Sequence, residues 1–152
     1  MVEDNAKLNV RVTGIFVKDG KILLNDCSGI HYALPGGRIQ MEEDSEEALK
    51  REVKEEMDES LINISFRGIF ENFFTIEGTK IHEYMWMYEA DFTDDKMFQS
   101  EDIYTTEGEK QNHFAWVNID ELDKIDFRPR AAIPLIQKND HMMHHVISHN
   151  SK

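Results

Sequence analysis

The 152-residue sequence has little cysteine and no long apolar run, and both absences narrow what the protein can be. Cys27 is the only cysteine. An intrachain disulfide is therefore excluded, and because nothing nearby resembles an activating base, we interpret Cys27 as a packing residue. No stretch approaches the roughly 18 consecutive apolar residues of a membrane span. The amino terminus lacks the basic and apolar regions of a signal peptide, so we expect a cytoplasmic protein.

Internal repeats and linker-like segments are also missing, which favours one domain over residues 1–152. Basic residues are few, because 17 Lys and Arg stand against 30 Asp and Glu, giving a net charge of −13. Such a surface repels nucleic acid and anionic membranes, so we expect neither as a partner. It also repels phosphorylated substrates, unless metal ions intervene.

One segment, from Leu34 to Glu59, organises the rest of the chain. It contains a Pro-Gly-Gly turn, a short acidic loop and then a run without Gly or Pro that is rich in helix formers. Asp44 and Glu47 have the spacing of a capping box. We therefore predict a helix that begins near Asp44 and continues to Met57.

Three carboxylates fall on one side of this predicted helix. At about 100° per residue, Glu52, Glu55 and Glu56 are neighbours. An adjacent stripe of apolar side chains would face the core: Leu49, Val53 and Met57. The carboxylates repel one another, and no lysine at i+4 offsets them on this face. A cluster of hard oxygen ligands is what Mg²⁺ needs, especially when the ion is shared with substrate phosphates, so the pattern favours a cation site over a solvated acidic helix.

The spacing of these residues resembles the signature of the Nudix hydrolases, G-x5-E-x7-R-E-U-x-E-E-x-G-U, in which U is aliphatic. Seven positions match in order: Gly37, Glu43, Arg51, Glu52, Val53, Glu55 and Glu56. The closing pair departs from the pattern, because Asp58 stands where Gly is usual and Glu59 where an aliphatic residue is usual. The signature covers about one sixth of the chain. It implies an α+β fold, the α/β/α sandwich of that family with a mixed β-sheet.

The same resemblance implies a reaction and residue roles. The reaction would be Mg²⁺-dependent hydrolysis of a diphosphate bond in a nucleoside diphosphate linked to another moiety, with Mn²⁺ as an alternative ion. Glu52, Glu55, Glu56 and the carbonyl of Gly37 would bind the metal, which would activate a water molecule. The catalytic set would be completed by two residues that brace the loop against the helix, Glu43 and Arg51. The partner would be a small nucleotide-type substrate, and the oligomeric state stays open, with a homodimer as one option.

Apolar patterns flank the central segment on both sides. Strands are predicted over residues 8–17, 22–24, 32–34, 62–75, 80–92 and 113–117. Asn118 and Glu121 have capping-box spacing and predict a short helix. A second helix follows with Pro129 in its first turn, and Pro134 divides or kinks it. From about residue 139 the histidine-rich chain is expected to be an exposed, flexible tail.

Candidate substrate contacts come from two arguments. The resemblance implicates the residues just before the Gly-Gly turn, His31 and Tyr32, with partly exposed loop residues as the alternative. Arg38, directly after the turn, is a further candidate. Glu71 and Glu83 each lie within an otherwise apolar strand, where a charge is costly unless it faces a polar cleft. We therefore predict that Glu71 and Glu83 line the substrate site.

The acidic stretch from Thr93 to Asn112 is predicted to be a loop of about twenty residues, long enough to suggest function or mobility. In the Nudix family this region often supplies another carboxylate, as a metal ligand or a base. By resemblance, Glu109 is the first candidate for this role and Glu107 the second. A merely solvated acidic loop is the alternative.

Two other functions stay open. A Nudix-like module could bind a nucleotide without cleaving it, although the intact R-E-x-x-E-E sequence argues for catalysis. An acidic helix could also bind Ca²⁺, although the chain has no EF-hand loop spacing. Release of phosphate or nucleotide with Mg²⁺ and with chelator would distinguish them.

Overall fold

The computed structural model describes residues 2–3 and 5–149, and within these residues the strands form two sheets. The larger sheet has the order β1 (Val2–Glu3), β2 (Ala6–Ile15), β8 (Thr79–Phe92), β7 (Leu61–Ile76) and β11 (His144–His149), and β6 (Gly36–Arg38) pairs with β2. The smaller sheet has the order β3 (Val17–Lys18), β4 (Lys21–Cys27), β10 (Lys110–Asn118) and β9 (Asp102–Glu107), and β5 (His31–Ala33) pairs with β4. The larger sheet is mixed, because β2–β8 and β7–β11 are parallel pairs whereas β7–β8 is antiparallel.

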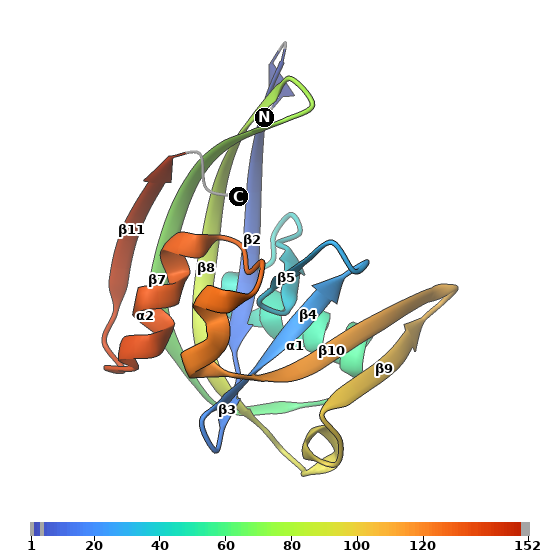
Figure 1. The fold of residues 1–152 in the computed structure, drawn as a ribbon. Coiled ribbons are helices and arrows are strands. Elements are labelled where there is room, and N and C mark those ends of the chain that lie inside the picture. Colours follow the sequence, from blue (N-terminus) through green and yellow to red (C-terminus); the bar gives the residue numbers. More distant parts are fainter. Residues whose placement is uncertain (1, 4, 150–152) are drawn as a thin grey trace.

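The helices pack against the sheets from different sides. They are α1 (Ser45–Met57), α2 (Ile133–Lys138) and the 3₁₀ helices η1 (Lys96–Phe98), η2 (Ile119–Lys124) and η3 (Arg130–Ala132). Leu49 and Val53 of α1 belong to one core cluster, with Val12 of β2. Ile133 and Ile136 of α2 belong to another, with the side chains of β4, β7 and β8. This arrangement confirms the predicted α+β sandwich with a mixed sheet (Figure 1).

Two long strands, β7 and β8, form the frame of the larger sheet. They were predicted over residues 62–75 and 80–92, and the structure confirms both. The chain reverses at Glu77 and Gly78, which have φ angles of 49° and 81°. The tip of the hairpin lies at the top of Figure 1, beside β1 and the start of β2. Its length matters for the site, because it carries polar side chains out past the apolar core.

The predicted loop over residues 93–112 is wrong in most of its length. After η1 the chain forms β9, turns at Gly108 (φ 60°) and returns as β10. Side chains of β9 alternate between exposed and half-buried, as in a regular strand: Asp102, Tyr104 and Thr106 are exposed, whereas Ile103, Thr105 and Glu107 are half-buried. Polarity alone therefore did not indicate a loop.

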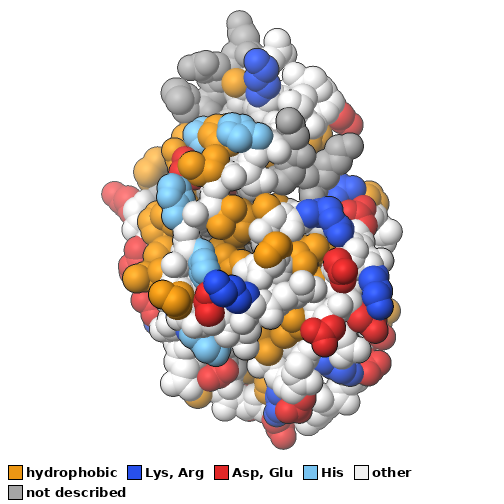
Figure 2. Space-filling model, turned by 60° about the vertical axis from the view of Figure 1, so that its left-hand side comes forward, with side chains coloured by type: hydrophobic (Ala, Val, Ile, Leu, Met, Phe, Trp, Pro, Cys, Tyr) orange, Lys and Arg blue, Asp and Glu red, His pale blue; other side chains and the backbone are white. Residues whose placement is uncertain are grey.

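The carboxy-terminal predictions also need correction. Residues 144–149 form β11 rather than a flexible tail, because the edge of β7 offers unpaired backbone groups. Gly68 permits this pairing, since a Cβ there would clash with the backbone of His144. His145 Nε2 lies 2.6 Å from Glu71 Oε2 and His144 Nε2 lies 2.9 Å from Asp140 Oδ1. Histidine side chains gather on this face of the molecule (Figure 2).

The predicted helix after Asn118 is the 3₁₀ helix η2, and Asn118 makes no side-chain capping bond. The next helix is divided as expected: Pro129 precedes η3, and Pro134 lies in the first turn of α2. None of the helices in the described part of the chain is long and apolar enough to cross a membrane.

Candidate active site

Local signals set both ends of α1, as the sequence predicts. The Asp44 side chain accepts a hydrogen bond from the Glu47 amide at 2.8 Å, which begins the helix. At the other end Asp58 has φ 53° and ψ 44°, the left-handed conformation in which helices commonly end. Ala48, Leu49, Val53 and Met57 are buried, which fixes the rotation of the helix about its axis. The neighbouring side of the helix faces β6 and β9, where Glu52 is half-buried and Glu56 is buried.

Arg51 joins the acidic loop to the helix. Its guanidinium donates to both oxygens of Glu43, at 2.6 and 3.0 Å, and to the backbone carbonyl of Arg38 at 3.0 Å. Another nitrogen donates to Glu52 Oε1 at 2.9 Å and to Glu55 Oε2 at 3.2 Å. The Arg51 hydrogen bonds lower the pKa of Glu43 below its ordinary value. One cation thus holds three carboxylates and the turn in a fixed arrangement.

Gly37 is the point at which the turn meets the helix. A Cβ atom at this position would clash with the Glu52 carboxylate, so only glycine lets that carboxylate lie directly against the backbone of β6. β6 is itself fixed by antiparallel pairing, in which Val12 of β2 is the partner of Gly37. Gly37 and Glu52 therefore come together, as the sequence predicts.

Glu56 is the buried member of the cluster, with 5% of its surface exposed. Burial raises the pKa of Glu56 to about 8, and the hydrogen bond and charge of Glu52 and the charge of Glu107 add to this effect. Glu52 and Glu56 cannot both ionise without an unfavourable electrostatic energy. A divalent cation between the two carboxylates would offset this repulsion. Hard oxygen donors suit Mg²⁺, so the residues present fit this ion.

The third helical carboxylate is placed differently. The Glu55 side chain is 44% exposed and binds Arg51. Among the residues that the structure describes, no three acidic, histidine or cysteine side chains already surround a metal-sized position. The pair Glu52 and Glu56 next to Gly37 is therefore the centre of the candidate site, with Glu55 at its exposed edge.

The β9–β10 hairpin brings Glu107 toward this pair. Glu107 raises the pKa of Glu56 through its charge, whereas Lys110 lowers it. Thr105 of β9 donates a hydrogen bond to the carbonyl of Glu56. Glu109, the first candidate from the sequence, lies exposed in the turn after Gly108. Of the two candidates, Glu107 therefore lies on the strand that contacts the helix, and Glu109 lies in the turn beyond it.

The predicted substrate contacts divide into separate groups. Glu83 of β8 lies near two cations, Arg11 and Arg38, and accepts hydrogen bonds from the side chains of Asn9 and Asn72. Burial raises the pKa of Glu83, although these four partners oppose the effect. Arg11 is not among the predicted substrate contacts, although the signal that selects Glu83, a charge within an apolar strand, applies equally to Arg11.

Glu71 lies on the other side of the sheet from Glu83. Asn72 is the register partner of Glu83, and successive side chains of a strand point to opposite faces. Glu71 instead binds His145. His31 and Tyr32 lie on β5, where the Tyr32 amide donates a hydrogen bond to the backbone carbonyl of Asp126. The pKa of His31 is lowered, mainly by burial and then by the charge of Arg128.

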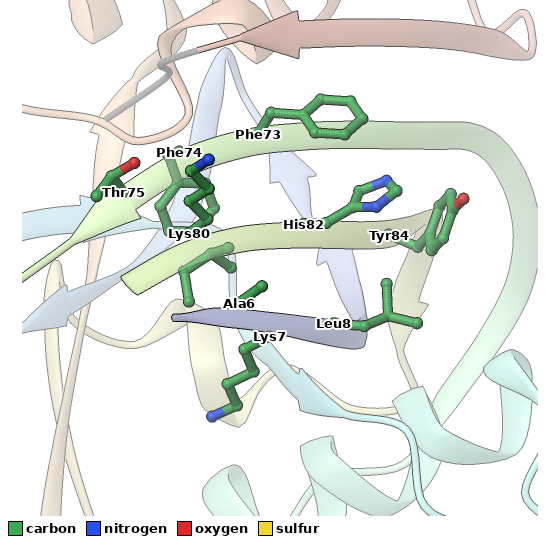
Figure 3. Close-up of a pocket in the computed structure, with 10 residues that line it drawn as sticks. Ala6, Lys7, Leu8, Phe73, Phe74, Thr75, Lys80, His82 and Tyr84 are labelled. Carbon is green, nitrogen blue, oxygen red and sulfur yellow. The ribbon is translucent and has the colours of Figure 1, made fainter. Parts of the chain in front are cut away.

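A cavity of about 510 Å³ lies elsewhere on the larger sheet. Figure 3 shows Leu8, Phe73, His82 and Tyr84 along it, and none of the predicted site residues is among those that line it. His82 and Tyr84 flank Glu83 in sequence and so point to the opposite face. The cavity is therefore separate from the acidic cluster.

Comparisons with known proteins agree with this geometry. The family model described as the NUDIX domain matches residues 7–137. A mutator MutT protein from Bacillus halodurans is 17% identical with a TM-score of 0.69, over 93% of this chain and 90% of that one. A MutT NUDIX hydrolase from Burkholderia pseudomallei is 21% identical with a TM-score of 0.63, over 88% and 98%. A UDP-X diphosphatase is 17% identical with a TM-score of 0.60, over 92% and 67%. A search of curated proteins found no match.

Proposed function

The chain belongs to the NUDIX domain family, and from this premise we propose that it is a Mg²⁺-dependent hydrolase of a diphosphate bond in a nucleoside diphosphate linked to another moiety. Hydrolysis of pyrophosphate bonds is the chemistry of the family. The observation that carries the proposal is the pair Glu52 and Glu56, held together beside Gly37 although burial and repulsion raise the pKa of Glu56 to about 8. A protein keeps such a costly pair where function needs it.

The ligands proposed for the metal are the carboxylates of Glu52, Glu55 and Glu56 and the carbonyl oxygen of Gly37. This set consists of oxygen donors alone, which suits Mg²⁺ and also Mn²⁺. A bound Mg²⁺ supplies charge neutralisation of the phosphates and lowers the pKa of a coordinated water. Glu107 is a further candidate ligand or base, because it already acts on Glu56 through its charge.

The chain's own residues contribute position and proton transfer. Arg51 and Glu43 hold the loop against the helix, so that the Gly37 carbonyl stays in place when phosphate charge enters the site. The Glu52 carboxylate lies against that backbone, where it can orient the attacking water and accept its proton. Arg11 and Arg38 provide local positive charge on a chain whose net charge is −13.

A nucleoside diphosphate derivative is the substrate class that we favour. One structure with the same fold is a UDP-X diphosphatase, a name that describes this kind of molecule. The cations near Glu83 would also meet a substrate that extends from the acidic cluster across β2. Such a substrate is small and needs no nucleic acid or membrane partner.

The test is product analysis with a panel of nucleotide sugars, ADP-ribose, dinucleoside polyphosphates and nucleoside triphosphates, each with Mg²⁺ and with EDTA. We expect at least one diphosphate-linked compound to release a nucleoside monophosphate with Mg²⁺ alone. Binding of these compounds without release of any product would contradict the proposal and favour a nucleotide-binding module. Equal turnover in EDTA would contradict the metal requirement.

A further inference from the structure

A row of polar side chains crosses the larger sheet beside the acidic cluster. The row consists of Asn9 and Arg11 on β2, Glu83 on β8 and Asn72 on β7. Strand register places Arg38 opposite Arg11, Asn9 opposite Glu83, and Glu83 opposite Asn72. Neighbouring strands lie about 4.8 Å apart. The row therefore begins one strand from the Gly-Gly turn and continues away from it.

The polar row lies next to the apolar core on the same face of the larger sheet. Met85 and Phe70 are the next residues on the same face of β8 and β7. They are buried in the core together with Leu24 of β4 and Leu34, which follows β5. Cys27 lies at the end of β4, near enough to Arg11 and Glu56 for both charges to act on the pKa of its thiol. The polar row and the acidic cluster therefore both have a charged residue near Cys27.

Two observations indicate that the polar row binds a ligand rather than only stabilising the fold. Glu83 is held by Asn9 and Asn72 and by two cations, which is a large set of partners for one carboxylate. Arg11 Nε, however, is buried and has no hydrogen-bond partner among the described residues. A buried donor of this kind is rare in a purely structural ion pair, because leaving it unpaired is costly. A bound phosphate or hydroxyl oxygen would satisfy it.

We propose that the polar row binds the part of the substrate that does not react, with Arg11 on a phosphate oxygen and Glu83 on the ribose hydroxyls. Guanidinium groups bind phosphate strongly, and an acidic side chain is a common acceptor for a ribose hydroxyl. The substrate class is then a ribonucleoside diphosphate derivative, and the 2′-deoxy form is rejected. This inference rests on the proposed function, and it adds the sugar to the diphosphate named there.

Binding is measured by calorimetry with Mg²⁺ and the α,β-methylene analogues of adenosine and uridine diphosphate, each in its ribose and 2′-deoxyribose form. We expect the wild-type protein to bind the ribose form about 10- to 100-fold more tightly, the scale of a hydrogen bond to a charged group. Glu83→Gln should lose this preference while still binding both forms. Arg11→Gln should weaken both forms to a similar extent, because both carry the diphosphate.

The matched control is Glu77→Gln, which removes the same charge at the exposed turn of the same hairpin and should leave the ratio unchanged. The inference is overturned if the wild-type protein binds the ribose and deoxyribose forms with equal affinity, or if it binds neither form. Both results come from the wild-type protein alone, so they do not depend on the folding of a variant. A preference that survives in Glu83→Gln also overturns it. The proposed function is tested separately. Ribose-selective binding without hydrolysis would contradict the hydrolase function, whereas equal hydrolysis of the ribose and deoxyribose substrates would contradict only the assignment of the polar row.

Discussion

Replacing Glu56 by glutamine should stabilise the metal-free protein at neutral and alkaline pH. The pKa of Glu56 is raised from 4.5 to about 8, mainly by burial. A carboxyl whose pKa is raised in the folded state does not lower the free energy of unfolding below about pH 4.5, because it is protonated in both the folded and the unfolded state. Stability then falls as the pH rises through the window from 4.5 to about 8. Glutamine keeps the shape of the neutral acid and cannot ionise, so the variant avoids this loss.

The magnitude follows from the size of the shift. Raising the pKa from 4.5 to about 8 corresponds to roughly 5 kcal/mol once the carboxylate is fully ionised. Because Glu52 and Glu107 can relax away from the new charge, we expect a measured gain of about 2–4 kcal/mol at pH 8.5 and less than about 1 kcal/mol at pH 5. Added Mg²⁺ should stabilise the wild-type protein more than the variant, since it neutralises the ionised pair.

The assay is urea unfolding in EDTA at pH 5, 7 and 8.5, for the wild-type protein, Glu56→Gln and Glu46→Gln. Glu46 is exposed on the first turn of the same helix, so its variant controls for loss of one helical charge. Unfolding free energies of the wild-type protein and Glu56→Gln that stay parallel across this pH range would refute the reasoning. They would show that Glu56 is not a buried acid held against its neighbours.

Three further predictions concern positions with specific geometry. Asp58→Gly should stabilise the fold by about 0.5–1 kcal/mol in urea melts, because Asp58 has φ 53°, and a gain in Asp58→Ala instead would contradict the left-handed exit. Gly37→Ala should lower kcat at least ~100-fold with folding retained by circular dichroism, since its Cβ would displace the facing carboxylate; near-normal turnover would show that this carboxylate can move freely. Burial lowers the pKa of His113, but hydrogen bonds and charges of Asp102 and Asp26 outweigh it, so the pKa is raised overall. Stability from His113 is therefore complete below its ordinary pKa of 6.5 and lost above its folded value, so His113→Gln should cost more in urea melts at pH 5.5 than at pH 9.

The helix at the centre of the site could be predicted from the sequence because its signals are local. Asp44 and Glu47 cap its start, a run of good helix formers fills it, and an apolar stripe fixes its rotation. Asp58 shows the same principle, since a short polar side chain takes the left-handed position where glycine is usual. The long strands β7 and β8 were equally clear, because their alternation continues over many residues.

Strands that depend on distant partners could not be predicted in this way. β9 is polar on its outer face and forms because β10 pairs with it, and β11 forms because β7 leaves an edge open. The strand also determines where the two acidic candidates lie: Glu107 is near enough to Glu56 for its charge to raise the pKa of Glu56, whereas Glu109 is exposed in the turn. A local pattern could have selected Arg11 as a charge within a strand, but its position beside Arg38 and Glu83 depends on the register of β2 with β6 and β8.

The most direct test of the central claim is the turnover number of Glu56→Gln on the best substrate of the panel, at saturating substrate and Mg²⁺. Cooperative unfolding at or above the wild-type stability would confirm that the variant is folded. We predict a loss of kcat of about 100-fold or more, the scale of removing a main electrostatic contributor. Turnover within about twofold of the wild-type value would contradict a catalytic role for the acidic cluster.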